Sequence, residues 1–265
     1  MITVLSCRGT GERLGAPGNL LTAVTGRLDP AKYSIGPEVD YPASIGPANP
    51  QYGLDGCSEE QSIDTGVRAL AAAVRATPNR AGLLGYSLGA EVVTRFLEAK
   101  ARGEYADCDI AWAANIANPL RREGDSIDPN PVGFGINGQR EPWPDCIPTW
   151  EVANPADCIT SCPADSPLRT LADTLSAFSF AEFGGWTRAM VDRLRVNRWQ
   201  PTRRDGWTRP VRTWRMWEAA AASMEGYLSG GQHNLAYQRD GYCERLADIL
   251  NAHEELPERL PSAIA

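Results

Sequence analysis

Residues 83–90, LLGYSLGA, place a serine between two glycines at the point where an apolar run meets a helical pattern. Leu83 and Leu84 predict a short buried strand, and the apolar residues of 91–100 recur on one face of a helix. The glycines on either side of Ser87 predict a tight turn, because glycine adopts backbone conformations that side chains disfavour. This segment therefore predicts a strand that turns directly into a helix.

Similar short apolar runs alternate with helical patterns along the first 164 residues. Further strands are predicted at 2–5, 109–116 and 149–153, and an alanine-rich helix at 62–74. Strands that alternate with helices form a parallel sheet that is covered on both faces. We therefore predict an α/β fold with a central, mainly parallel sheet flanked by helices.

The pattern changes between residues 165 and 230, where no strand is predicted and apolar residues recur at helical spacing. An amphipathic helix is predicted again over 240–253. This order predicts a catalytic core made of residues 1–164 and 231–265, with a helical insertion at 165–230.

The composition disfavours two classes of partner. The chain has 265 residues and a formal net charge of -7, which argues against a surface for nucleic-acid phosphates. No apolar run approaches the roughly 20 residues needed to cross a bilayer, so we expect no stable membrane span. Residues 1–13 lack the layout of a signal peptide, so we expect a protein made without its own leader.

Seven cysteines are an odd number, and without a leader to an oxidising compartment most are expected to be free thiols. Cys158 and Cys162 have the spacing of a metal-binding or disulfide pair. No second pair of cysteines or histidines with zinc-like spacing accompanies them, so we expect a structural role. We predict no metal and no cofactor.

Ser87 is a candidate nucleophile. In the turn called a nucleophile elbow, serine lies between a strand and a helix, and small neighbours leave room for adjacent backbone. The following helix directs its N-terminal N–H groups, Leu88 among them, toward a developing oxyanion. An ordinary turn serine is the alternative, since the letters Gly-x-Ser-x-Gly alone also arise by chance.

A serine nucleophile needs a base and an acid. Of the two histidines, His233 follows both candidate acids in a glycine-rich loop, whereas His253 lies beside glutamates on the polar side of the last helix. We predict His233 as the base and a surface role for His253. The acid is expected after a strand between serine and histidine, which Asp157 satisfies. Asp165 is the alternative acid, or else a helix N-cap.

The second oxyanion donor is expected in a loop after an early strand. Residues 7–12, CRGTGE, form such a loop, and we predict the Thr10 N–H, helped by its hydroxyl, as the donor. An ordinary glycine turn is the alternative. Arg8 and Glu12 are expected to form an ion pair that stabilises the loop.

Together these segments resemble the cutinase superfamily of serine esterases and, within it, the lysin B enzymes of mycobacteriophages. The similar segments are CRGTGE at 7–12, YPASIGP at 41–47, SIDTGV at 62–67, GYSLGA at 85–90, IANPLRREG at 116–124, ANPADC at 153–158 and HNLAY at 233–237. The resemblance implies a cutinase-like α/β-hydrolase fold with a helical linker between acid and base. It also implies a triad of Ser87, Asp157 and His233, with Thr10 and Leu88 at the oxyanion hole.

Lysin B enzymes are esterases that release mycolic acids from the arabinogalactan of the mycobacterial envelope during host lysis. The resemblance implies mycolyl-arabinogalactan, or another long-chain acyl ester, as substrate. It also implies synthesis in the cytoplasm of the infected host and action at the host envelope once lysis begins. The alternatives are a general cutinase-like lipase or carboxylesterase, and a domain that binds cell-wall lipid or glycan without catalysis.

Five tryptophans lie between residues 186 and 217. Trp214 and Trp217 have the spacing of a buried helical stripe, which favours a role in the core of the insertion. Trp199 and Trp207 flank Pro201 among arginines, in a segment more typical of an exposed surface. We predict that these two residues contact the acyl chain of the substrate, with a structural role as the alternative.

Overall fold

The computed structural model describes residues 1–45, 57–129, 132–169, 219–220, 222–223, 225–226 and 230–254. Its centre is a five-stranded sheet with the order β2-β1-β3-β4-β5. Each of these neighbouring strand pairs is parallel, as the sequence predicts. The strands are β1 (Ile2–Cys7), β2 (Tyr33–Ile35), β3 (Ala81–Tyr86), β4 (Ile110–Ile116) and β5 (Thr149–Val152).

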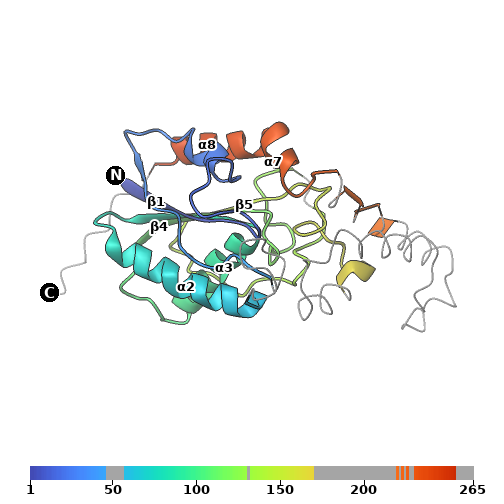
Figure 1. The fold of residues 1–265 in the computed structure, drawn as a ribbon, viewed down its shortest axis with the longest axis horizontal. Coiled ribbons are helices and arrows are strands. Elements are labelled where there is room, and N and C mark those ends of the chain that lie inside the picture. The colour runs from blue at the N-terminus through green and yellow to red at the C-terminus, as the bar shows by residue number, and fades with distance from the viewer. Residues whose placement is uncertain are drawn as a thin grey trace.

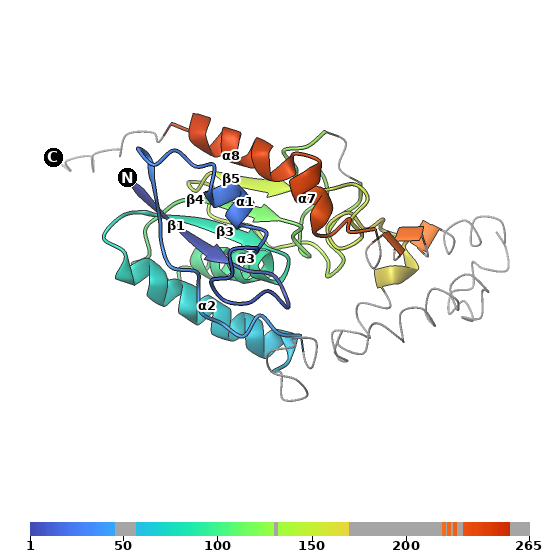
Figure 2. The same ribbon diagram turned by 45° about the horizontal axis from the view of Figure 1, so that its top comes forward.

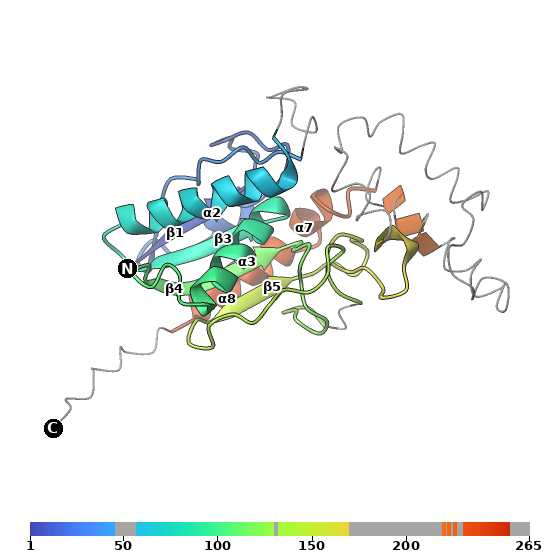
Figure 3. The ribbon, with the colours of Figure 1, turned by 90° about the horizontal axis from the view of Figure 1, so that it is seen from below.

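Helices cover both faces of this sheet (Figure 1). On one face lie α2 (Glu59–Ala76) and α3 (Leu88–Ala101), which run side by side (Figure 3). On the other face lie the short α1 (Thr22–Thr25) and α8 (Tyr242–Ala252), with α7 (Leu235–Arg239) leading into α8 (Figure 2). The chain therefore has the three-layer arrangement of an α/β fold.

Alternate residues of each strand point to the two helical layers, because successive side chains of a strand face opposite ways. In β3, Leu83 packs with the α2 and α3 residues, whereas Leu84 packs with the α8 residues. Both leucines are fully buried. This double burial explains why the strands read as continuous apolar runs rather than as alternating patterns.

The helix bounds differ from the sequence prediction for identifiable reasons. Helix α2 begins at Glu59 rather than at Ser62, because Ser58 and Gln61 form a capping box at its N-terminus. The helix predicted over 240–253 corresponds to α8, which begins at Tyr242 because Gly241 before it adopts a left-handed φ of 77°. The short α7 was not predicted. The edge strand β2 has only three residues and was not predicted.

The predicted helical insertion at 165–230 falls mostly outside the described residues, and so do Trp199 and Trp207. The boundaries of the insertion and the substrate contacts of these tryptophans therefore stay predictions. Among the helices within the described ranges, none has the length and apolarity needed to cross a bilayer.

Candidate active site

The candidate site lies at the carboxyl ends of the parallel strands, where ligand sites of open α/β sheets occur. Ser87 directly follows β3, and its φ of 53° is unusual for a residue with a side chain. Its N–H donates to the Ile116 carbonyl at the end of β4, over 3.0 Å. This geometry is that of a nucleophile elbow, in which the strained turn exposes the serine hydroxyl.

The glycines around Ser87 are required by close backbone contacts. A Cβ on Gly85 would lie 2.6 Å from the Ala90 Cα, and one on Gly89 would lie 2.0 Å from the Cys7 carbonyl oxygen. Gly9, in the loop after β1, also approaches the site, because a Cβ there would lie 3.4 Å from the Ser87 Cβ. Gly85 and Gly89 are therefore required by how tightly α3 packs on β3 and β1.

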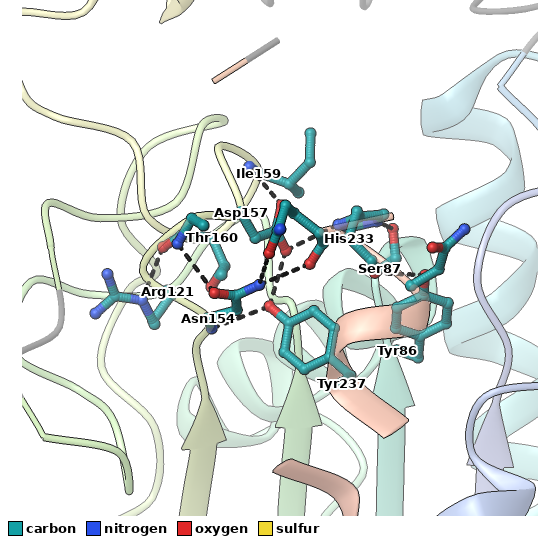
Figure 4. A network of polar contacts seen from close by, with 12 residues as sticks. Tyr86, Ser87, Arg121, Asn154, Asp157, Ile159, Thr160, His233 and Tyr237 are labelled. Carbon is teal, nitrogen blue, oxygen red and sulfur yellow. Dashed lines mark hydrogen bonds and ion pairs between the residues drawn. The ribbon is translucent and has the colours of Figure 1, made fainter. Parts of the chain in front are cut away.

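His233 links the serine to a carboxylate (Figure 4). Its Nε2 lies 2.8 Å from the Ser87 Oγ, and its Nδ1 lies 2.9 Å from the Asp157 Oδ2. The Tyr86 hydroxyl donates to the His233 carbonyl over 2.8 Å and holds its backbone against β3. The structure thus brings together the serine, histidine and aspartate that the sequence predicts as a triad, in hydrogen-bond contact.

Asp157 is fully buried and is held by its surroundings. Its Oδ1 accepts the Ile159 N–H over 3.0 Å, while its Oδ2 accepts the Tyr237 hydroxyl over 2.8 Å as well as the histidine. The three hydrogen bonds to this buried carboxylate offset the free-energy cost of removing it from water. Such a group can orient the imidazole and stabilise its cationic form.

Two buried polar residues hold the loop that carries Asp157 (Figure 4). The Asn154 Nδ2 donates to both the carbonyl and the side-chain oxygen of Gln232, each over 2.9 Å, so the acid loop is joined to the base loop. The Arg121 Nε donates to the Thr160 carbonyl over 2.8 Å, and its other nitrogens donate to further loop carbonyls. Burial lowers the pKa of Arg121, an expected cost of placing a guanidinium inside the protein.

The predicted oxyanion donors belong to the residue after the serine and to the loop after β1. Leu88 is the first residue of α3, so the helix itself supplies no acceptor for its N–H. Thr10 follows Gly9 in the loop that contacts Ser87, and its hydroxyl is buried without a hydrogen-bond partner among the described residues. A buried donor without a partner, one residue after a glycine that approaches the nucleophile, is consistent with the predicted oxyanion hole.

The predicted ion pair between Arg8 and Glu12 is replaced by a different arrangement. Arg8 pairs with Glu38 at 3.6 Å, and its Nε donates to the backbone carbonyl of Glu12 rather than to its carboxylate. The Glu12 carboxylate instead accepts the N–H groups of Gly9 and Leu20, over 2.8 and 2.7 Å. Burial raises the pKa of Glu12. The predicted pair of Arg8 with Glu12 was wrong, because the Glu12 carboxylate binds the backbone N–H groups of its own loop instead of the guanidinium.

The alternative residues lie elsewhere. Asp165 is exposed in a turn, and the acid that contacts His233 is Asp157. His253 ends α8, and its ring lies edge-on against Trp150 with centroids 5.0 Å apart, so it is half-buried rather than solvated. Cys158 and Cys162 are buried free thiols whose pKa values are raised by burial. No cluster of three metal-binding side chains occurs within the described ranges.

Sequence reasoning did not identify Tyr237, Asn154 or Arg121. Tyr237 belongs to the HNLAY segment, four residues after His233, and a helical turn at that point would have placed the two side by side. Arg121 lies in a charged segment, PLRREG, which reads as a surface loop. Its complete burial follows from tertiary contacts with carbonyls distant in sequence.

The parallel sheet, the strained serine turn and the Ser–His–Asp contacts define the α/β-hydrolase class of fold. The sequence matches no protein-family model and no curated protein. Among solved structures, lysin B from Mycobacteriophage D29 is similar over 92% of this chain and 98% of its own, with a TM-score of 0.50 and 16% identity. This similarity shows that the chain shares the fold of that protein.

Two smaller structures cover less of the chain. The catalytic core domain of acetyl xylan esterase from Trichoderma reesei covers 68% of this chain and 95% of its own, with a TM-score of 0.49 and 19% identity. A cutinase-like protein from Cryptococcus sp. covers 60% of this chain and 78% of its own, with a TM-score of 0.43 and 19% identity.

Proposed function

We propose that this chain is a serine esterase. The observation that carries the proposal is the pair of contacts at His233, 2.8 Å to the Ser87 Oγ and 2.9 Å to the Asp157 Oδ2. They match the relation of nucleophile, base and acid in serine hydrolases. The strained turn at Ser87 and the uncommitted Thr10 hydroxyl support the same assignment.

In this mechanism the Ser87 Oγ attacks the ester carbonyl carbon while His233 accepts the hydroxyl proton. The resulting oxyanion accepts hydrogen bonds from the N–H groups of Leu88 and Thr10. The tetrahedral intermediate collapses, and the alcohol leaves with the proton held by His233. Water then attacks the acyl-serine by the same steps, which releases the carboxylic acid and regenerates the hydroxyl.

We further propose that the substrate is the ester between mycolic acid and arabinogalactan in the mycobacterial envelope. The similarity of the fold to lysin B over 92% of the chain supports this substrate, as do the shared sequence segments. In this proposal the protein is made in the infected host cytoplasm and acts at the envelope as a phage endolysin. The predicted acyl contacts at Trp199 and Trp207 belong to the same proposal.

Two measurements test these proposals. An organophosphonate probe should label Ser87 stoichiometrically in the wild-type protein and leave Ser87→Ala unlabelled. An absence of labelling would favour a non-catalytic cell-wall binder. Purified mycolyl-arabinogalactan should then release free mycolic acids on incubation with the enzyme. Hydrolysis of p-nitrophenyl butyrate without this release would favour a general carboxylesterase or lipase.

A further inference from the structure

A tyrosine contacts the acid of the triad. Tyr237 is fully buried on α7, and its hydroxyl lies 2.8 Å from the Asp157 Oδ2. The same carboxylate oxygen accepts the hydrogen bond from His233 at 2.9 Å (Figure 4). The histidine and the tyrosine therefore share one acceptor atom, and the mechanism above gives the tyrosine no role.

A second contact of the Tyr237 hydroxyl fixes the direction of its hydrogen bond with Asp157. The backbone N–H of Asn154 donates to the Tyr237 oxygen over 3.2 Å. The phenol thus accepts from the backbone and has its own proton available for the Asp157 Oδ2. Burial raises the pKa of Tyr237 well above its ordinary value, so the phenol keeps that proton.

The contact also joins two separate parts of the chain. Asn154 and Asp157 follow β5, whereas Tyr237 lies four residues after His233. A single phenol oxygen therefore fixes the acid loop relative to the segment that carries the base. With the Ile159 N–H on Oδ1, the carboxylate is held at both of its oxygens.

We propose that Tyr237 is a positioning residue that holds Asp157 in the orientation required by His233. The proposal rests on the esterase function proposed above. Tyr237 acts through Asp157, and its effect is greatest when His233 carries the proton taken from Ser87. Loss of the hydroxyl is therefore expected to lower kcat while KM stays the same.

The test is Tyr237→Phe, which removes the hydroxyl and keeps the ring that packs on Tyr242. With p-nitrophenyl butyrate, kcat should fall on the order of 10- to 100-fold, since the lost bond is to a charged group, and KM should change less than about 2-fold. The matched control is Tyr33→Phe, which removes a buried hydroxyl that donates to the Leu250 carbonyl near the C-terminal end of α8. That variant should keep wild-type kcat.

A double-mutant cycle separates positioning from a merely structural role. In the Asp157→Asn background, Tyr237→Phe should lower kcat less than about 2-fold further, because the carboxylate through which it acts is already lost. The same 10- to 100-fold loss in both backgrounds would overturn the proposal. Wild-type kcat in Tyr237→Phe would also overturn this proposal, but it would leave the proposed esterase function standing. Wild-type protein that neither hydrolyses esters nor reacts with the phosphonate probe would overturn both.

Discussion

Gly89, in the first turn of α3, packs against the carbonyl of Cys7 at the end of β1. A methyl group on its Cα would lie 2.0 Å from that oxygen and 2.4 Å from the carbonyl carbon. Both clashing atoms belong to backbone that is fixed in the sheet, so neither can rotate away. The position of α3, and with it the position of Ser87, depends on the absence of a side chain at Gly89.

Replacement of this glycine should destabilise the protein. We expect Gly89→Ala to lower the free energy of unfolding by roughly 3 kcal/mol or more, and the Tm by about 10 °C, because α3 must move away from β1. Gly18→Ala is the matched control, since nothing lies within 4 Å of a Cβ at that glycine. Differential scanning calorimetry of both variants checks the prediction, and equal Tm values for both would contradict it.

The triad gives a prediction about activity. Ser87→Ala and His233→Ala should each lower ester hydrolysis on the order of 10⁴-fold or more, with little change in Tm, because nucleophile and base act as a unit. Asp157→Asn should also be severe, since the imidazole loses its orienting carboxylate. Asp165→Asn should be mild, because Asp165 is exposed in a turn. The reverse order for the two aspartates would assign the acid to Asp165.

The sheet could be predicted because local patterns determine it. The strands predicted at 2–5, 83–84, 109–116 and 149–153 overlap β1, β3, β4 and β5, all of which belong to the parallel sheet. The edge strand β2 could not be predicted, since three residues carry too little periodicity to distinguish a strand from a loop. The five-residue α7 was not predicted for a similar reason, whereas the longer amphipathic pattern of α8 was recognised to within two residues of its start.

For the site, chain order and local context pointed to the serine, histidine and aspartate that lie in hydrogen-bond contact in the structure, because each lies at a recognisable position in the pattern. The second layer of contacts was not predictable in this way. Arg121 donates to carbonyls as far away as Thr160, and Asn154 donates to Gln232. Such partners are chosen by the folded geometry of loops, for which a single sequence carries no periodic signal.

The Thr10 hydroxyl gives a further prediction about the oxyanion hole. It is buried and has no partner among the described residues, as expected if it donates only to the charge that develops in the transition state. Thr10→Val keeps the shape and the backbone N–H, and should lower kcat by up to about 10²-fold with KM unchanged. Thr10→Ser should stay near wild type. Wild-type kcat in Thr10→Val would restrict the oxyanion hole to backbone N–H groups.

Glu151 is a fully buried carboxyl group on β5. Its Oε1 accepts the side-chain amides of Asn118 and Asn115, over 2.9 and 3.4 Å, while its Oε2 has no partner in the described part of the chain. Burial, the largest cause, raises its pKa from 4.5 to about 7. In the folded protein this carboxyl therefore keeps a proton at pH values where the unfolded chain releases it.

This proton makes stability depend on pH in a definite direction. The contribution of Glu151 to the free energy of unfolding is fully present below about pH 4.5 and is lost as the pH rises through about 7. At pH 8 the buried charge therefore costs on the order of 3 kcal/mol of that free energy. Glu151→Gln cannot ionise and keeps a side-chain oxygen that can accept from Asn118. Urea unfolding should therefore show the variant more stable than wild type by up to about 3 kcal/mol at pH 8 and nearly equal at pH 5. Glu244→Gln, at an exposed position on α8, should show no such difference between the two pH values. If Glu151→Gln gave the same difference from wild type at both pH values, the carboxyl would be ionised in the folded protein throughout this range.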